Sequence, residues 1–401
     1  MSTDHKLPAL RPIEVVPFRR SDGEVYFALR DPTELAPRGI AISAAGCFVL
    51  AHLDGQHSAA DIQATFRAQV GLALPEEEVL QLVQALDGAL LLQGERVEHA
   101  LAERRAVYRL ATVRDNRDRY PGPAALSAAI QKTLAGGVAA PVRELNGLIA
   151  PHLDYARGAP CYADAYATLA QETPADRFVI LGTNHSGESA SVVATTKDFQ
   201  TPLGRVPNDR DFISRLEQEV GSPLSLNEHD HAREHSVELQ VHVLQVIMGD
   251  SPFTIVPFLC PDVTGPTGTA PLDGIGPDLA HFGDALARIR ADSDGRTVVI
   301  AGADLSHVGQ RFQDAEPTTS EFLEEVARSD RALLTLLEQQ ADEAFLAQIR
   351  ASDNRTRICS TGCIYALLRS LPGRALRVLS YHQAVDMQAE THVTCAAAVV
   401  L

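Results

Sequence analysis

One design occurs three times in this 401-residue chain: a short apolar strand ends at glycine or proline, and a histidine follows within a few residues. Proline lacks the N–H that a sheet ladder needs, so a proline directly after an apolar run marks the end of a strand. Parallel strands end at one edge of an open α/β sheet, where such sheets bind ligands, so the side chains beyond them are expected to meet. The strands are expected at residues 145–150, 177–183 and 297–302, and the side chains that follow are His152, His185, Asp304 and His307.

Three further apolar runs predict strands at residues 254–259, 378–382 and 393–401. Helical stretches such as 161–171 separate the strands. Apolar strands that alternate with helices are typical of an α/β protein whose sheet is covered by helices on both faces. We therefore predict an α/β fold for the larger, C-terminal part of the chain.

The N-terminal part predicts a separate, small α+β domain. Ser58 and Asp61 have the spacing of a capping box at the start of a helix. Helices followed by a return strand would give a winged-helix arrangement. The expected elements are a strand at 25–29, helices at 42–53, from 58 and from 75, and a return strand at 90–92.

Composition excludes several function classes. A net charge of −17 argues against a nucleic-acid partner, and the helix that starts after Pro75 begins with three glutamates and carries no lysine or arginine through Leu86. No apolar run approaches the length that spans a bilayer, and the first ten residues lack the apolar core of a signal peptide. The six cysteines are dispersed, as is usual for reduced thiols in a cytoplasm. We expect a cytoplasmic protein with no nucleic-acid or membrane partner.

A lone histidine at a strand end is more often structural than a ligand, but several converging on one edge favour a metal site. Imidazole together with carboxylate suits iron, copper or zinc better than magnesium or calcium. A second histidine-rich stretch opens a helix, in which His235, Glu238 and His242 are expected on one face, and His235 is close enough to the strand ends to reach them. His229 and His231 are better explained as part of a polar loop.

With these pieces assembled, the chain from about residue 112 to 401 resembles the Memo family. The motifs occur in family order and are specific only in combination. They are Ala150-Pro151-His152, Leu181-Gly182-Thr183-Asn184-His185, Thr201-Pro202-Leu203-Gly204, Glu234-His235-Ser236-Val237-Glu238, Asp304-Leu305-Ser306-His307 and Ile358-Cys359.

The resemblance implies a sheet similar to that of LigB-type extradiol dioxygenases, which use non-haem Fe(II). It implies a transition metal ion, iron or copper, held by His152, His185 and Cys359, with Asp304 and His307 nearby. Among bacterial and archaeal relatives the chain is similar to AmmeMemoRadiSam system protein B, a Memo protein associated with a radical-SAM protein and an Ammecr-type protein. These two proteins are therefore the expected partners.

The chain departs from the family pattern after the cysteine. It reads Ser360-Thr361-Gly362-Cys363, where relatives usually have glycine, arginine and a proline, so the anion or substrate specificity of the pocket is expected to differ. Cys363 is either a second thiol in the site or an ordinary core residue. If residues 359–363 are helical, Cys359 and Cys363 share a face.

The N-terminal part resembles PqqD-like peptide-recognition domains, mostly through its hydrophobic pattern. Such domains add the strand of a precursor peptide to a sheet edge. We accordingly predict a PqqD-like winged-helix domain at residues 1–105 and a Memo-like domain at 106–401. A winged helix used only for packing or dimerisation remains the alternative.

Three functions are compatible with these residues. The first is a metal-dependent, dioxygenase-like oxidoreductase in which His307 acts as general acid or base, Asp304 fixes the tautomer of His307, and His235 can act from the opposite wall. The second is a non-catalytic metal carrier or redox adaptor. The third, compatible with either, is an accessory role in peptide modification, in which the N-terminal domain delivers a peptide.

Overall fold

A computed structural model describes residues 5–20, 23–36, 39–141, 144–172, 174–185 and 187–401. The chain forms two compact units, Met1–Leu110 and Ala111–Leu401, each built around its own apolar core. The first unit ends with α4 (Glu95–Leu110). The predicted division between residues 105 and 106 lies within this helix.

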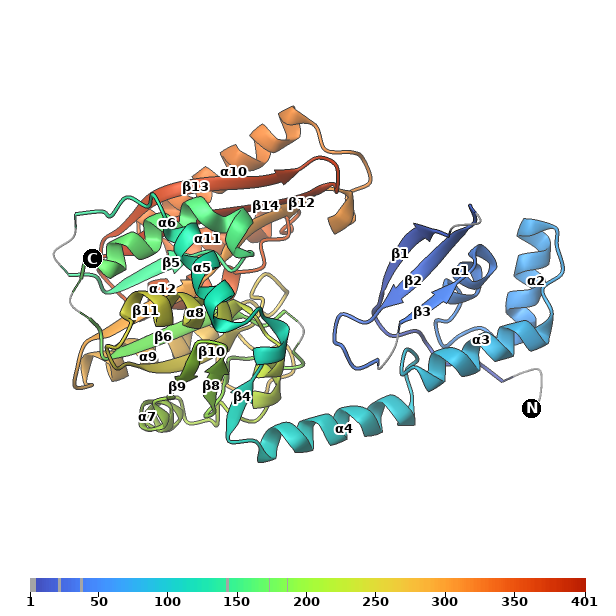
Figure 1. The fold of residues 1–401 in the computed structure, drawn as a ribbon, viewed down its shortest axis with the longest axis horizontal. Helices are drawn as coiled ribbons and strands as arrows, with labels where there is room; N and C mark the ends of the chain where they lie inside the picture. The colour runs from blue at the N-terminus through green and yellow to red at the C-terminus, as the bar shows by residue number, and fades with distance from the viewer. Residues whose placement is uncertain (1–4, 21–22, 37–38, 142–143, 173, 186) are drawn as a thin grey trace. The chain divides into compact units, whose positions relative to one another are not determined.

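The N-terminal unit is a three-stranded antiparallel sheet in the order β1-β2-β3, followed by helices (Figure 1). Ser58 and Asp61 form the predicted capping box, in which each side chain accepts the backbone N–H of the other residue. The helices pack around buried Ile62, Val79 and Leu86. The elements before α4 are β1 (Glu14–Arg19), β2 (Val25–Arg30), β3 (Ile40–Ile42), α1 (Ala44–Leu50), α2 (Ala59–Val70) and α3 (Glu76–Gly88).

Two details of the predicted N-terminal domain are wrong. The leucines at 90–92 do not form a return strand: Leu91 N–H donates to the Leu86 carbonyl at 3.0 Å, which closes a turn after α3, and Leu92 makes only an isolated bridge to Leu10. Their apolar character serves burial, since Leu91 and Leu92 are almost fully inaccessible. The helix expected at 42–53 is shorter, because Ile42 ends β3 and Ser43 caps α1.

The C-terminal unit is built on an eight-stranded mixed sheet, which confirms the predicted mixed α/β architecture. Its strand order is β12-β14-β5-β11-β6-β10-β7, and β13 pairs with β14. The central strands β5, β11, β6 and β10 are parallel, whereas β14 is antiparallel to β5, β12 and β13. The strands are β5 (Gly147–Ala150), β6 (Arg177–Thr183), β7 (Val193–Ala194), β10 (Thr254–Cys260), β11 (Thr297–Gly302), β12 (Asp304–Val308), β13 (Leu376–Asp386) and β14 (Thr391–Val400).

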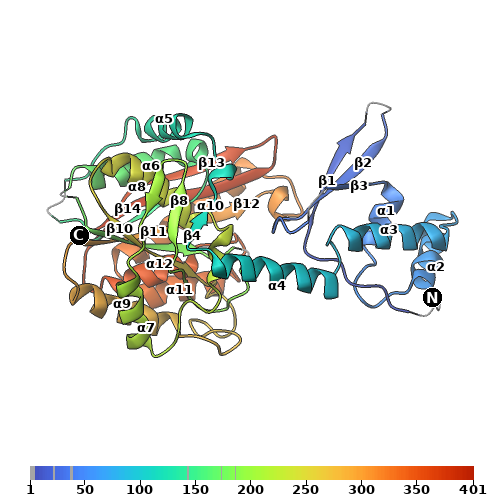
Figure 2. The same cartoon turned by 60° about the horizontal axis from the view of Figure 1, so that its bottom comes forward.

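Helices cover both faces of this sheet. Alternate residues of β11 belong to different cores: Val298 and Ile300 face one, and Val299 and Ala301 face the other, as expected for a strand buried on both sides. In Figure 2, α5, α6 and α8 lie on one side of the sheet and α7, α9, α11 and α12 on the other. The helices are α5 (Pro123–Leu134), α6 (Tyr155–Ala170), α7 (Arg210–Val220), α8 (Ser236–Met248), α9 (Leu279–Ala291), α10 (Ser320–Glu338), α11 (Asp342–Ala351) and α12 (Thr361–Ser370).

A small second sheet of three strands, β4 (Val113–Asp115), β8 (Asp198–Thr201) and β9 (Gly204–Val206), and three short 3-10 helices, η1 (Arg117–Arg119), η2 (Glu228–Ala232) and η3 (Gln310–Phe312), complete the unit. Within the part of the chain that the structure describes, no helix is both long and apolar enough to cross a bilayer.

Candidate metal centre

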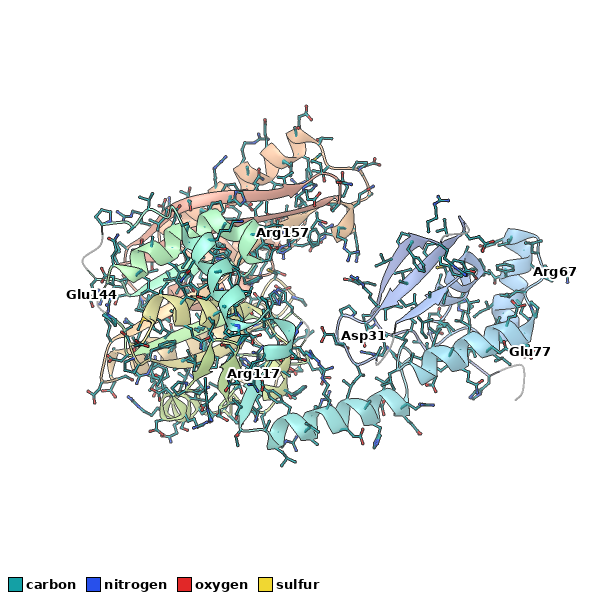
Figure 3. The ribbon with its side chains drawn as sticks, in the orientation of Figure 1. Asp31, Arg67, Glu77, Arg117, Glu144 and Arg157 are labelled. Atoms are coloured by element: carbon teal, nitrogen blue, oxygen red, sulfur yellow. The ribbon has the colours of Figure 1, made fainter. Side chains whose placement is uncertain are left out.

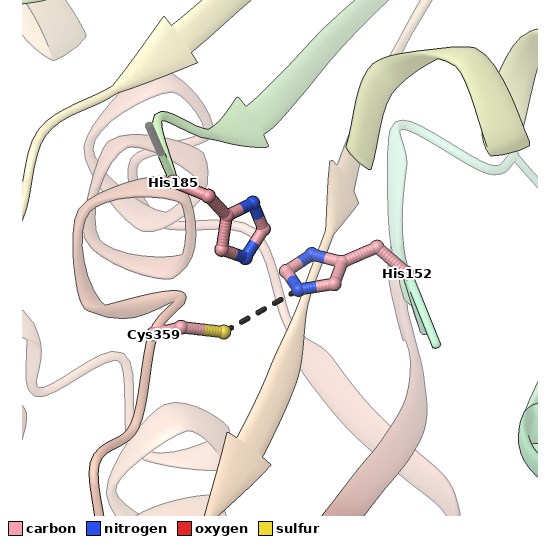
Figure 4. Close-up of side chains that lie close together, drawn as sticks. All are labelled: His152, His185 and Cys359. Atoms are coloured by element: carbon pink, nitrogen blue, oxygen red, sulfur yellow. Dashed lines mark hydrogen bonds between the residues drawn. The ribbon is translucent and has the colours of Figure 1, made fainter. Parts of the chain in front are cut away.

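Three side chains from distant parts of the chain meet beyond the carboxyl ends of the central parallel strands. His152 follows β5, His185 follows β6, and Cys359 lies just before Ser360, the residue that precedes α12. One ligand atom from each lies within 4.8 Å of the corresponding atoms of the other two (Figure 4). The structure thus brings together the three residues that the family resemblance singled out as metal ligands.

Backbone contacts fix the orientation of His152. Its Nδ1 lies 2.8 Å from the carbonyl oxygen of Gly302 at the end of β11. A carbonyl oxygen only accepts, so Nδ1 carries the proton and donates. Nε2 then faces the Cys359 sulfur at 3.3 Å, the contact dashed in Figure 4. The chain turns immediately into α6, where Asp154 accepts the Arg157 N–H as a helix cap (Arg157 is labelled in Figure 3). His152 is held from both sides and is 3 % exposed.

His185 is oriented by a buried carboxylate. Its Nδ1 donates to Glu234 at 3.0 Å, and its backbone N–H donates to the same carboxylate at 3.0 Å. Glu234 also accepts the backbone N–H groups of His235 at 2.8 Å and Ser236 at 2.9 Å. Carboxylate oxygens fixed in this way anchor one imidazole nitrogen and leave the other, Nε2, available to a metal. Glu234 belongs to the Glu234–Glu238 motif, but nothing in the sequence indicated that it orients His185.

A tightly hydrogen-bonded loop positions Cys359. The Asn354 side chain makes two hydrogen bonds with the backbone of Ile358. Its NH₂ group donates to the Ile358 carbonyl at 3.1 Å, and its oxygen accepts the Ile358 N–H at 2.8 Å. Asp353, Asn354 and Arg357 all adopt left-handed backbone conformations, which turn the chain sharply before the cysteine. The loop therefore delivers the sulfur to the two imidazoles at the start of α12.

Electrostatics favour the thiolate form of Cys359. Burial raises the pKa of this thiol, but the charge of His152 and hydrogen bonds from His152 and His185 outweigh burial and hold the pKa well below its usual value. Burial alone would lower the pKa of His185, but its hydrogen bonds to Cys359 and Glu234 outweigh burial and raise this pKa to about 9. The metal-free site therefore resembles a thiolate–imidazolium pair, and a cation that displaces the imidazole protons finds a charged sulfur ligand.

Asp304 serves His152 rather than His307, which corrects the predicted role in tautomer selection. Asp304 accepts the His152 backbone N–H at 3.1 Å, and its second oxygen lies 3.5 Å from His152 Nε2. His307 instead donates from Nδ1 to the carbonyl of Leu305 at 3.1 Å, and Phe312 lies against its ring. The Leu305 carbonyl therefore orients the His307 ring. Its charge reaches the site, because it lowers the pKa of Cys359.

His235 belongs to the site, but Glu238 and His242 do not share its surroundings as the helical pattern predicted. His235 lies before the first turn of α8, and its ring stacks on His185 with centroids 4.9 Å apart. Glu238 pairs with buried Arg114 at 2.8 Å, and His242 bonds to the Tyr155 hydroxyl. Burial lowers the pKa of His235 to about 4, so its ring is neutral at pH 7.

A second group, His185, Glu234 and His235, also has the composition of a metal site. It does not provide an independent one, because the Glu234 carboxylate already accepts three backbone N–H groups and the His185 ring. Access to the first group comes from this side. The side chains of His185 and His235 are 30 % and 45 % exposed, against 3 % for His152.

Cys363 lies in the apolar core and outside the three-residue group. Of the two roles considered for Cys363, the structure therefore favours a core residue over a second thiol in the site. Cys359 precedes α12, so helical spacing does not bring the two thiols onto one face. Cys363 Sγ instead contacts the Thr183 hydroxyl at 3.2 Å. His231 is likewise structural, because it is 1 % exposed and bonds to the Val193 carbonyl.

Comparison with known proteins identifies the family of this chain. The family model for Memo-like proteins matches residues 119–400. The chain belongs to the Memo-like family. A MEMO1 family protein of Aquifex aeolicus is 26 % identical over 368 residues, covering 89 % of this chain and 92 % of that protein. One of Thermus thermophilus is 28 % identical over 332 residues, covering 80 % and 91 %.

A solved structure of an uncharacterized Escherichia coli protein aligns with a TM-score of 0.39 at 16 % identity, covering 64 % of this chain and all of that one. The Aquifex match is longer than the Memo-like domain, so it includes part of the Met1–Leu110 unit.

The donor set of the Memo-like domain fits a transition metal ion. Two imidazoles present Nε2 while their Nδ1 atoms are anchored, and a thiolate completes the group. Nitrogen and sulfur donors suit iron, copper or zinc, whereas magnesium and calcium require oxygen. His152, His185 and Cys359 are thus the residues that would hold the ion.

Proposed function

We propose that the Memo-like domain is a metal-dependent oxidoreductase of the dioxygenase-like kind, with iron or copper as the metal. The observation that carries this proposal is the convergence of two anchored imidazoles and one thiolate on a single point that is open on one side. A redox-active ion in such a site supplies electron transfer to an oxidant and Lewis acidity toward a bound substrate.

The surrounding residues have separable tasks in this proposal. His235 is neutral at pH 7 and more exposed than its neighbours, so it can accept a proton from a substrate that enters from this side. His307 contacts the Leu305 carbonyl through Nδ1, so Nε2 is the ring atom that can exchange a proton with a substrate from β12. Asp304 holds the backbone and ring of His152 in place.

A non-catalytic metal carrier or redox adaptor is the second candidate. The low pKa of Cys359 supports it, because a thiolate that is favoured before any metal binds is also a redox-reactive group. Turnover separates the two candidates, since metal content alone is expected for both.

We further propose that the Memo-like domain works with a radical-SAM protein and an Ammecr-type protein, and that the N-terminal unit is PqqD-like and presents a peptide to it. What supports peptide binding is a groove of about 230 Å³ beside β3, the last strand of the N-terminal sheet, lined mainly by apolar side chains of β3, α1 and α3. An extended peptide can add to such an edge and place side chains in such a groove.

Anaerobic reconstitution of the full chain with Fe(II) or Cu(I), followed by oxygen-uptake measurements with a panel of catechols and peptides, tests the enzymatic proposal. We expect one equivalent of metal and substrate-dependent uptake, both lost in Cys359→Ala. His99→Ala, on exposed α4, is the control and should behave as the wild type. Bound metal without uptake across the panel would favour the adaptor, and absence of metal binding would remove both candidates.

Fluorescence polarisation with labelled peptides encoded near the gene tests the N-terminal unit in the full chain. Leu82→Arg places a charge on the groove and should abolish binding. Leu80→Arg lies on the same helix, is already 38 % exposed and does not line the groove, so it should bind as the wild type does. Equal binding by both variants would refute the groove as the peptide site.

A further inference from the structure

A serine hydroxyl lies directly against the candidate sulfur ligand. Ser360 Oγ is 3.4 Å from Cys359 Sγ, and Ser360 is completely inaccessible to solvent. The same oxygen accepts the backbone N–H of Asp304 at 3.0 Å and lies 3.3 Å from the Thr183 hydroxyl. Ser360 therefore connects β12 with the loop that carries the Cys359 sulfur. Asp304, the first residue of β12, in turn binds His152.

The contacts around Ser360 Oγ favour the Cys359 sulfur as the acceptor of its proton. The Asp304 N–H can only donate, so it takes one lone pair of Ser360 Oγ. Three groups lie within hydrogen-bond distance of Thr183 Oγ1. They are Ser360 Oγ at 3.3 Å, the Cys359 carbonyl at 3.5 Å and Cys363 Sγ at 3.2 Å. Thr183 can therefore donate to Ser360 or to the carbonyl, and Cys363 can donate to Thr183. The Ser360 proton is left with one charged acceptor, the Cys359 thiolate, and charge-assisted hydrogen bonds are the stronger ones.

We propose that Ser360 is a positioning residue that donates its hydroxyl proton to the Cys359 thiolate and thereby limits how much charge the sulfur gives to a bound metal. This inference rests on the proposed function, because it needs a metal at Cys359. Hydrogen bonds to a thiolate ligand stabilise its lone-pair electrons and favour the reduced state of the metal.

Cobalt(II) provides a readout that does not depend on activity. Thiolate-bound Co(II) shows a sulfur-to-metal charge-transfer band, whose energy rises when a hydrogen bond stabilises the sulfur electrons. Anaerobic titration of the full chain should give this band in the wild type. In Ser360→Ala and Ser360→Gly the band should shift to lower energy.

Ser370→Ala is the matched control. Ser370 lies on the adjoining helix α12, is as buried as Ser360, and donates to the Leu367 carbonyl at 2.8 Å. It should leave the band unchanged. Should Ser360→Ala and Ser360→Gly fail to fold, Ser360→Thr keeps the hydroxyl, and its band must coincide with that of the wild type.

The outcomes separate this inference from the proposed function. A wild-type band that stays at the same energy in Ser360→Ala and Ser360→Gly overturns the role of Ser360 and leaves the metal site standing. A wild-type protein that binds Co(II) without the band, or does not bind it, overturns the thiolate-ligated site and the role of Ser360 together. A shift confined to the Ser360 variants supports both.

Discussion

Replacing Glu234 with glutamine tests whether the carboxylate behind His185 preorganises the metal centre. The two carboxylate oxygens have different partners: Oε1 accepts the N–H groups of His235 and Ser236, and Oε2 accepts the His185 N–H. Glutamine keeps one oxygen and turns the other into an NH₂ group. In either amide orientation at least one buried backbone N–H then faces a donor.

The magnitude follows from this mismatch. A buried donor left without an acceptor costs about 1–3 kcal/mol of folding stability. Loss of a carboxylate that anchors a ligating histidine typically weakens metal binding by about 10–100-fold. We therefore expect Glu234→Gln to raise the dissociation constant for Zn(II) or Co(II) by one to two orders of magnitude, while Cys359 still ligates.

Competition with a chromophoric chelator measures the dissociation constant, and urea denaturation of the metal-free protein measures stability. Asp198→Asn is the matched control, because Asp198 is a buried carboxylate that pairs with Arg205 and Arg210 and makes no contact with the three candidate ligands. It should lower stability and leave metal affinity unchanged. A folded Glu234→Gln protein with wild-type affinity would refute the reasoning.

Three further predictions concern single residues of the Memo-like domain, the last with a control in the N-terminal unit. Cys359→Ser should lower Co(II) affinity at least about tenfold and remove the charge-transfer band, because a neutral hydroxyl replaces the thiolate; titration checks this. Burial lowers the pKa of His242 from its usual 6.5 to about 4. Between these two pH values His242 is protonated in the unfolded chain and neutral in the folded protein. Stability should therefore fall on acidification from pH 6.5 toward 4, and His242→Gln should make the slope of unfolding free energy shallower by up to about 1.4 kcal/mol per pH unit. Gly362→Ala should disrupt the start of α12 and metal binding, since its Cβ would lie 2.1 Å from the Pro261 carbonyl oxygen, whereas Gly88→Ala, with open space around it, should raise the thermal midpoint of the N-terminal unit.

The strand ends were predictable from the sequence because burial on both faces gives a β strand a continuous apolar run. The apolar runs therefore predict that His152 and His185 lie at one edge of the sheet, as they do in the structure. Cys359 has no such local signal, since a loop precedes it, and only the family resemblance pointed to it.

The contacts that orient the site were not predictable in the same way. Whether Asp304 serves His152 or His307 depends on the register of β12 against its neighbours, and spacing along the chain suggested the wrong partner. The leucines at 90–92 illustrate a related limit, because a short apolar run satisfies burial equally well as a strand or as a turn. Glu234 was visible in a motif, but its role depends on backbone N–H groups that converge only after folding.

The separation of the candidate ligands along the chain has a consequence for biosynthesis. Cys359 follows His152 by 207 residues. At a translation rate of about 5–20 residues per second, the sulfur leaves the ribosome roughly 10–40 s after the first imidazole. During part of that interval the nascent chain holds both candidate imidazoles without the sulfur that completes the site. Correct loading is therefore expected after release from the ribosome, and the metal supply of the cell at that moment determines which ion the finished protein carries.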